Sequence, residues 1–324
     1  MTKPDPLQEA ARILSGADEV ALVCHVNPDA DALGSMLGLA GFLAERGVKV
    51  SATWPNGIED PPRWLEALPG REHLVAPRDM PKAPPVLVTL DAAHIDRLGG
   101  LQHLVDKAGA SIWIDHHRTN PGFGTVQLID PDAAATAQIT LRLIELMGGP
   151  LSPAVATCLY AGLVTDTGRF QYEAATPEVL RAAATLREQP FDHAALAQAL
   201  YEDSSLAYLK LLGVVLARVE HVPERSLVYT YVDRKDLKEH AVPIQETDDL
   251  IDIIRTAREV DVAAVLKEQR EGGYKVSLRS RGKTDVAAVA DRFGGGGHRL
   301  AAGYSFAGTL EGAVAALVEA LPAA

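Results

Sequence analysis

The sequence predicts an α/β fold in which a doubly wound, mainly parallel sheet domain is followed by a smaller α+β domain. From residue 20 to about residue 170, short apolar runs alternate with segments whose apolar residues recur at helical spacing. The short runs are apolar on both faces, which is typical of parallel strands covered by helices. After Pro190 the strands alternate between apolar and polar residues, which indicates a sheet with one solvated or ligand-facing side.

These patterns give an expected order of elements. In the first domain we expect strands at 20–24, 49–53, 86–90 and 111–114 and helices at 32–46, 134–147 and 153–164. In the second we expect strands at 227–232, 262–267 and 274–280 and helices at 246–258, 286–293 and 310–321. The domains are expected at 1–190 and 218–324, with a helical connector over 191–217 between them.

Composition excludes several classes of protein. The 324 residues include 31 Lys and Arg against 43 Asp and Glu, a formal charge of −12, which argues against a general nucleic-acid coat protein. Cys24 and Cys158 lie in apolar runs, where we expect buried thiols in a reduced compartment. The N-terminal segment lacks a signal-peptide stretch, and no window reaches the ~18 apolar residues of a membrane span. We therefore expect a soluble, cytoplasmic protein.

Carboxylate and imidazole side chains follow several of the predicted strands. In an open parallel sheet, ligands bind beyond the carboxyl ends of the strands. One such residue alone has a simpler explanation, since Asp29 could cap the next helix and Asp166 could belong to a turn. Four segments that deliver acids or histidines to one edge are not explained in this way. These residues are His25, Asp29 and Asp31, then Asp91, then Asp115, His116 and His117, and finally Asp166.

The composition of this set predicts a metal site. Carboxylates brought close together repel one another and must either stay partly protonated or bind cations. The absence of Cys disfavours structural zinc or an iron–sulfur cluster, whereas carboxylates with a minority of imidazoles suit Mn²⁺. Two ions that share Asp91 and Asp166 could activate a water molecule and stabilise charge on a phosphoryl group.

Five ordered motifs resemble the DHH phosphoesterase family over almost the whole chain. The string HVNPDADALGS, which begins at His25, resembles the first motif of that family, and Asp91 after its apolar strand resembles the second. Asp115-His116-His117 resembles the third motif, and DTGRF, which begins at Asp166, the fourth. The run GGGGH over 294–298 resembles the signature of the associated C-terminal domain.

The resemblance implies a role for each matching residue. One Mn²⁺ would be held by His25, Asp29, Asp91 and Asp166, and the other by Asp31, Asp91, His116 and Asp166. Asp115 would orient His116, and a water that bridges the two ions would attack phosphorus in line. His117 would lie beside the scissile phosphate and donate a hydrogen bond or a proton. Relatives also imply a homodimer formed through the N-terminal domain.

The C-terminal part of the chain predicts a substrate clamp. Gly295, Gly296 and Gly297 could present their N–H groups to an anion, although a flexible turn is the simpler explanation of a glycine run. Between residues 274 and 299, six Lys and Arg stand against two Asp, a local charge of +4 in an acidic chain. Arg279 and Ser280, at the end of a strand, are placed to bind a second phosphate, and His298 could cap it.

The expected function is a Mn²⁺-dependent phosphoesterase that acts on short oligoribonucleotides, pAp and cyclic di-AMP or its linear product pApA. Within the family, the two-domain length and GGGGH resemble the nano-RNase and pAp-phosphatase branch. These substrates all carry adenine or ribose and two phosphates, so the residues do not rank them. Two alternatives remain, a pyrophosphate or polyphosphate hydrolase and a sensor that binds a cyclic dinucleotide without turnover. Neither long duplex nucleic acid nor a membrane is an expected partner.

Overall fold

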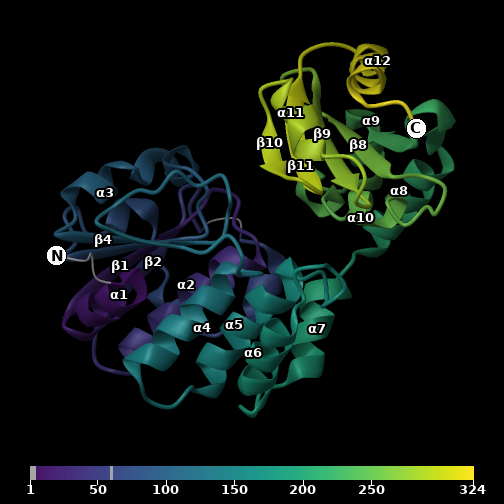
Figure 1. Ribbon diagram of the computed structural model, residues 1–324. Helices are drawn as coiled ribbons and strands as arrows, with labels where there is room; N and C mark the ends of the chain where they lie inside the picture. The colour runs from purple at the N-terminus through teal and green to yellow at the C-terminus, as the bar shows by residue number, and fades with distance from the viewer. Residues whose placement is uncertain (1–4, 59–60) are drawn as a thin grey trace. The chain divides into compact units, whose positions relative to one another are not determined.

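The computed structural model describes residues 5–58 and 61–324 and divides the chain into two compact units (Figure 1). The first unit is Met1–Asp203 and the second is Ser204–Ala324. No helix in the described residues is long and apolar enough to cross a membrane.

The division falls inside the segment 191–217, which was expected to be one helical connector. The segment forms two helices instead, α7 (His193–Tyr201) in the first unit and α8 (Leu206–Ala217) in the second. Each has its own N-cap, because the side chain of Asp192 accepts from the backbone of α7 and that of Ser205 from the backbone of α8. The second unit therefore begins earlier than residue 218.

The first unit is built on a five-stranded sheet in which all pairs are parallel and the order is β2-β1-β3-β4-β5. This is a doubly wound order, with its switch point between β1 and β3. The strands predicted at 49–53 and 86–90 are confirmed with the same bounds. The strands are β1 (Glu19–Cys24), β2 (Lys49–Thr53), β3 (Val86–Leu90), β4 (Ala110–Asp115) and β5 (Val126–Ile129).

Helices cover both faces of this sheet, as Figure 1 shows for α3 on one side and α2, α4 and α5 on the other. The larger hydrophobic core lies between the sheet and the helices α2, α4 and α5. A smaller hydrophobic core surrounds the buried Trp113. Arg63–Ala67, Arg71–His73, Pro77–Asp79 and Ile95–Leu101 are 3₁₀ turns. The helices are α1 (Pro6–Ser15), α2 (Ala30–Ala44), α3 (His103–Lys107), α4 (Thr136–Met147), α5 (Pro153–Asp166) and α6 (Pro177–Arg187).

The backbones of α2 and α5 approach closely at two glycines. A Cβ atom at Gly34 would overlap the carbonyl oxygen of Cys158, and one at Gly162 would lie 2.6 Å from Asp31 Oδ1. Any side chain at either position would push the two helices apart. The close approach holds the first turn of α2, which carries Asp31, against the helix that ends at Asp166.

The second unit contains a six-stranded mixed sheet of order β10-β11-β9-β8-β7-β6. Only β7 and β8 pair in parallel among its described strands, and the other pairs are antiparallel. The strands predicted at 227–232 and 274–280 are confirmed. The strands are β6 (Glu220–Val222), β7 (Leu227–Val232), β8 (Val262–Glu268), β9 (Tyr274–Ser280), β10 (Gly296–His298) and β11 (Ala301–Phe306).

Both faces of this second sheet carry helices, which differs from the expected single solvated side. The helices α11 (Val286–Asp291) and α12 (Leu310–Ala320) pack on the face that contains Val276 and Leu278. On the other face, α8 and α10 (Leu250–Ile254) cover the central strands. Arg279 on β9 remains partly exposed on that face. Helix α9 (Arg234–His240) packs against α8.

The helix expected at 246–258 is much shorter in the structure. A 3₁₀ turn, Ile244–Thr247, precedes α10, and the hydroxyl of Thr247 donates to the carbonyl oxygen of Ile244 at 2.6 Å. This local bond competes with the helical ladder. Asp248 then pairs with the buried Lys267 of β8, so the segment follows the sheet instead of continuing as a helix.

We expect Gly34→Ala to lower the free energy of unfolding of the first unit by about 1–3 kcal/mol, because the new methyl group overlaps the α5 backbone. Gly41→Ala on the same helix is the matched control, since its Cβ would meet only Val155 Cγ2, at 3.7 Å. The control should keep or slightly raise stability. Urea unfolding of the two variants measures both effects, and equal midpoints would contradict the packing argument.

Candidate metal centre

The strand register brings the predicted acids to one edge of the first sheet. Cys24, the last residue of β1, pairs with Leu90, the last residue of β3, and Leu90 pairs with Ile114 near the end of β4. The next residues along the chain, His25, Asp91 and Asp115, therefore lie at the same level, and Asp115 is itself the last residue of β4.

Asp91 lies at the centre of the site. It has a left-handed backbone conformation, with φ of 57°, and is 2% exposed. Such a φ is uncommon outside glycine and often occurs at functional sites. Its Oδ2 lies 3.5 Å from His25 Nε2, and its Oδ1 lies 3.6 Å from His116 Nε2 and accepts from the hydroxyl of Thr136 at 2.8 Å.

His25 and Asp29 form one side of the site. His25 Nδ1 donates to the carbonyl oxygen of Val26 at 2.8 Å, so its Nε2 faces Asp29 and Asp91. Asp29 is the N-cap of α2, and its Oδ1 accepts from the backbone N–H groups of Asp31 and Ala32. The cap explanation of Asp29 is thus correct, yet its Oδ2 still lies 3.7 Å from His25 Nε2.

Asp31 is fully buried in the first turn of α2. Its Oδ2 accepts from the backbone N–H of Thr136 at 2.7 Å, and its Oδ1 from that of Ala137 at 2.9 Å. Those two N–H groups belong to the first turn of α4, whose own N-cap Ala135 has no capping side chain. Asp31 therefore caps α4 from another helix.

His116 and Asp166 complete the other side. His116 Nε2 lies 3.1 Å from Asp166 Oδ2, and Asp166 is the last residue of α5. Together with Asp31 and Asp91, His116 forms a group whose potential ligand atoms all lie within 4.8 Å of one another. A second such group is His25, Asp29 and Asp91. Asp91 is common to both.

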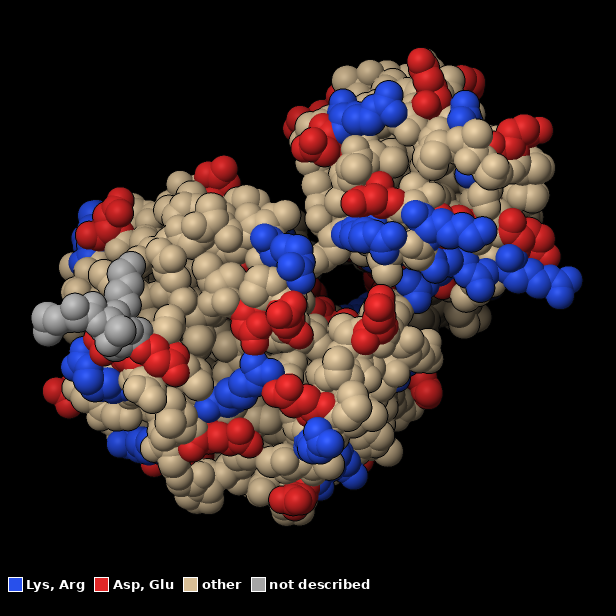
Figure 2. Space-filling model, viewed as in Figure 1, with Lys and Arg blue, Asp and Glu red and all other residues tan. Residues whose placement is uncertain are grey.

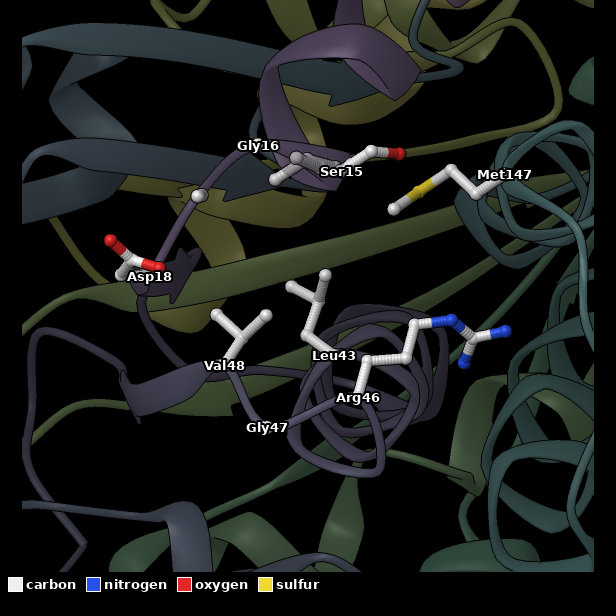
Figure 3. Close-up of a pocket in the computed structure, with 10 residues that line it drawn as sticks. Ser15, Gly16, Asp18, Leu43, Arg46, Gly47, Val48 and Met147 are labelled. Atoms are coloured by element: carbon white, nitrogen blue, oxygen red, sulfur yellow. The ribbon is translucent and has the colours of Figure 1, made fainter.

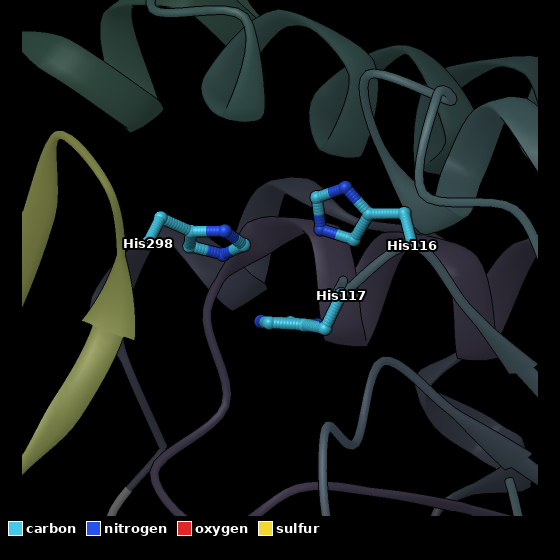
Figure 4. Close-up of side chains that lie close together, drawn as sticks. All are labelled: His116, His117 and His298. Atoms are coloured by element: carbon cyan, nitrogen blue, oxygen red, sulfur yellow. The ribbon is translucent and has the colours of Figure 1, made fainter. Parts of the chain in front are cut away.

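Asp115 contacts His117, whereas the family resemblance implied that it orients His116. His117 Nδ1 donates to Asp115 Oδ1 at 2.7 Å, while His116 Nδ1 lies 3.4 Å from the carbonyl oxygen of Ala133. The two imidazoles follow β4 and meet edge to face, with ring centroids 4.8 Å apart (Figure 4). Asn120 Nδ2 donates to the other Asp115 oxygen at 2.5 Å. The bond to Asp115 fixes the Nδ1–H tautomer of His117.

The crowded charges shift several pKa values. Burial, with repulsion from Asp91 and Asp29, raises the pKa of Asp31 well above its ordinary value. Burial and the neighbouring carboxylates raise the pKa of Asp166 in the same way. Burial would also raise the pKa of Asp91, but a hydrogen bond from His25 and the nearby imidazoles lower it. Burial lowers the pKa of His25, yet Asp29 and Asp91 outweigh it and raise the value to about 10.

This donor set fits divalent cations. The pKa values of Asp31 and Asp166 are raised by burial and by repulsion from the neighbouring carboxylates, and cations would relieve that repulsion directly. The donors are carboxylate oxygens and imidazole nitrogens without a thiolate, since both cysteines, Cys24 and Cys158, are buried and free. Such donors suit a divalent ion of intermediate hardness.

In the second unit, the register aligns two of the predicted clamp residues. Ala301 of β11 pairs with Arg279 on one side and with His298 on the other, so both side chains lie on the same face of the sheet. Because the two residues lie two strand spacings apart, their backbones are separated by about 10 Å. His298 is also drawn in Figure 4. Arg279 Nε lies 3.6 Å from Asp252 Oδ1.

The other clamp residues lie differently from what was expected. Ser280 is buried, and its hydroxyl accepts from the backbone N–H of Gly282 at 3.1 Å, so it is used inside the second unit. The glycine run is an edge strand instead of a flexible turn, because Gly296 and Gly297 belong to β10. A Cβ at Gly295 or Gly297 would overlap the backbone of β11, which explains why side chains are excluded there.

A separate hollow of about 400 Å³ lies at the opposite, amino-terminal end of β1 and β2 (Figure 3). Asp18 and Val48 line it, as does Arg46. The Arg46 guanidinium stacks over the Phe42 ring, 3.4 Å from its centroid, and donates to the carbonyl oxygens of Phe42 and Gly148. These contacts give Arg46 a structural role in joining α2 to the end of α4.

Sequence reasoning missed three residues of the centre. Thr136 contacts Asp91, Asn120 contacts Asp115, and Arg97 donates to the carbonyl oxygen of Val26 beside His25. Asn120 lies only three positions after the Asp-His-His run, so a polar residue there was a usable signal. Thr136 and Arg97 come from segments without a motif, and only the fold brings them to the site.

Comparison with known families defines the class of protein. The model of the DHH family, N-terminal domain, matches residues 19–163, and that of the DHHA1 domain matches residues 224–323. The chain belongs to the DHH family and is an enzyme of the phosphoesterase class.

Individual relatives lie close in sequence and structure. The chain is 38% identical over 307 residues to the bifunctional oligoribonuclease and PAP phosphatase NrnA of Thermus thermophilus, covering 94% of this chain and 89% of that protein. It is 27% identical over 306 residues to the cyclic-di-AMP phosphodiesterase GdpP of Geobacillus thermodenitrificans, covering 88% of this chain and 44% of that protein. The structure of an exopolyphosphatase-related protein from Bacteroides fragilis superimposes with a TM-score of 0.91 at 27% identity, covering 99% of this chain and 97% of that one.

We expect Asn120→Ala to reduce phosphoesterase turnover about 10- to 100-fold, because it removes the donor that holds Asp115 and hence His117. The affinity for Mn²⁺ should change little, since Asn120 contacts none of the proposed ligands. Steady-state kinetics and a Mn²⁺ titration by calorimetry separate the two effects. Thr119→Ala, an exposed neighbour, is the control, and unaltered turnover in Asn120→Ala would remove the positioning role.

Proposed function

We propose that the protein is a Mn²⁺-dependent phosphoesterase that hydrolyses short oligoribonucleotides, pAp and cyclic di-AMP or pApA to mononucleotides. The observation that carries this proposal is the position of Asp91 between two sets of ligand atoms, one on each of its carboxylate oxygens. The names of the Thermus and Geobacillus relatives support the nucleotide class of substrate.

The proposed ligands divide into two overlapping sets. One Mn²⁺ would be held by His25, Asp29, Asp91 and Asp166, and the other by Asp31, Asp91, His116 and Asp166. Two such ions supply a water of lowered pKa and neutralise charge on the phosphoryl group. Asp91 is suited to the shared position because its lowered pKa keeps the carboxylate ionised, so that both oxygens can act as ligand atoms.

His117 is proposed to act on the substrate. Its Nδ1 donates to Asp115, and in this proposal its Nε2 faces the phosphoryl group or the leaving oxygen. Burial lowers the pKa of His117, but the bond to Asp115 and the charge of Asp91 outweigh it and raise the value. An imidazole that is readily protonated can donate its Nε2 proton to the departing oxygen.

The second unit is proposed to recognise a second phosphate of the substrate. Arg279 and His298 share one sheet face, and the glycines of β10 leave the adjacent backbone uncovered by side chains. Arg binds phosphate through several N–H groups at once. This arrangement supports pAp and dinucleotides over a lone phosphomonoester. Ser280, buried as it is, would support Arg279 from the strand instead of touching the substrate.

The charge of the chain also supports a small substrate. Acidic and basic side chains are interspersed over the viewed surface of the first unit (Figure 2), and the formal charge of the chain is −12. Long nucleic acid is bound mainly through many phosphate contacts with cations. The name of the Bacteroides structure favours one other candidate, a polyphosphate or pyrophosphate hydrolase. Phosphate release from these nucleotide-free compounds tests that candidate.

We expect the purified protein with Mn²⁺ to release AMP from pApA, pAp and cyclic di-AMP, and EDTA to abolish the release. Asp166→Ala should lose turnover of every substrate by several orders of magnitude, because it removes a ligand from both ions. Chromatography of the products gives the rates, and their ranking identifies the preferred substrate. Metal-independent binding of cyclic di-AMP without turnover would instead favour a sensor.

We expect Arg279→Ala to raise KM for substrates with a second phosphate about 10- to 100-fold and to leave kcat within a few-fold, because a charge-assisted contact to phosphate is lost. Arg281→Ala on the adjacent turn is the control, since its guanidinium donates to the carbonyl oxygen of Ala257. Unchanged kinetic constants for pAp in Arg279→Ala would exclude the clamp.

A further inference from the structure

The turn after Asp166 has an unusual backbone. Gly168, Arg169 and Phe170 are consecutive and all left-handed, with φ of 56°, 62° and 63°. Such values are uncommon for residues with a Cβ and persist only where the surroundings enforce them. Here the hydroxyl of Thr167 accepts from the N–H of Phe170 at 3.2 Å, and its carbonyl oxygen accepts from the N–H of Tyr172 at 3.1 Å.

The turn sends its two aromatic rings in opposite directions. Phe170 packs inward, with its ring centroid 6.3 Å from that of Tyr160 in the first core. Tyr172 points outward and is 38% exposed. No other Phe, Tyr or Trp in residues 5–58 and 61–324 is as exposed. Trp113, the aromatic residue next to the Asp-His-His run, is fully buried and donates to the carbonyl oxygen of Ala92.

The Tyr172 ring is supported from beneath. A Cβ at Gly168 would overlap the ring atoms of Tyr172, so the ring lies directly against the Gly168 backbone, two residues beyond the proposed ligand Asp166. Arg169, between them, is held away by Tyr201, with its guanidinium 3.9 Å from that ring centroid. The result is a flat aromatic ring with one face on the Gly168 backbone, on the turn that directly follows Asp166.

We propose that Tyr172 is a stacking platform for the nucleobase of the nucleotide whose phosphate lies at the metal centre. This rests on the proposed function, because only a nucleotide substrate brings a base to that position. An exposed ring held rigidly by backbone loses little entropy when a base stacks on it. Every base has a π-face, so stacking tolerates different bases, as an enzyme of mixed short oligonucleotides requires. The strained turn has a function in this view, since it presents the ring.

The test compares pAp with ribose 3′,5′-bisphosphate, which has the same phosphates and sugar but no base. Tyr172→Leu should raise KM for pAp about 10- to 100-fold, the range expected for loss of one stacked base, with a smaller effect on kcat. KM for the base-free substrate should stay within about 2-fold of the wild type, and Tyr172→Phe should retain wild-type values for both. Gln171→Ala, an exposed neighbour, is the control.

Two results overturn the platform. Equal losses on both substrates would mean that Tyr172 merely supports Asp166, and unchanged constants in Tyr172→Leu would mean that no base stacks there. If the wild type fails to turn over pAp, the proposed hydrolysis of pAp fails, and calorimetric binding of AMP then tests the platform separately. AMP that binds about 10-fold more weakly to Tyr172→Leu than to the wild type supports it. AMP that binds equally to both, or to neither, overturns it.

Discussion

The contact between α2 and α5 is the constraint on which the candidate metal centre depends. Gly34 and Gly162 leave no room for a side chain, so the two helices meet backbone to backbone. One helix carries Asp31 in its first turn, and the other ends at Asp166. Because these carboxylates come from distant parts of the chain, this packing brings them together near Asp91. The interior is close-packed, so a shift of one helix would be transmitted to the site.

Electrostatics works against the same arrangement. Four carboxylates around one point repel one another, and the raised pKa values of Asp31 and Asp166 reflect burial together with that repulsion. The fold offsets part of the cost with His25 and His116 and with the N-terminal end of α4, whose N–H groups point at Asp31. Bound cations would offset the rest of the repulsion between the carboxylates. A bound divalent cation would therefore complete the charge of this site.

Much of the fold could be predicted from the sequence, because buried parallel strands are continuous apolar runs. Strands such as VLVTL at 86–90 are found at the predicted bounds. The helix predicted at 246–258 from the spacing of apolar residues was too long, because contacts with the rest of the fold determine the structure there. Thr247 and Asp248 turn the chain toward β8. The edge strand β10 was not among the predicted strands, because glycines carry no strand signal and only their pairing with β11 orders them.

The candidate site was predictable to a similar degree. Residues on motif segments could be named, because the ends of parallel strands meet at one edge. The neighbour that each of these residues contacts could not be predicted from the sequence. Asp115 faces His117 because of the local course of the chain after β4, and Asn120 reaches Asp115 through the turn that follows. Thr136 depends on where α4 begins relative to α2, and no pattern in its own segment indicates this.

The dual role of Asp31 has a practical consequence for anyone who seeks an inactive form of this protein. Its carboxylate closes the first turn of α4 from outside that helix, so its removal would leave two buried N–H groups without acceptors. Such a protein would be damaged in its scaffold as well as in its chemistry, and its inactivity would be ambiguous. Asp166 ends a helix with its side chain partly open to solvent, and among the described residues its carboxylate accepts from no backbone N–H of another helix. It is the cleaner choice for trapping an intact complex with uncleaved substrate.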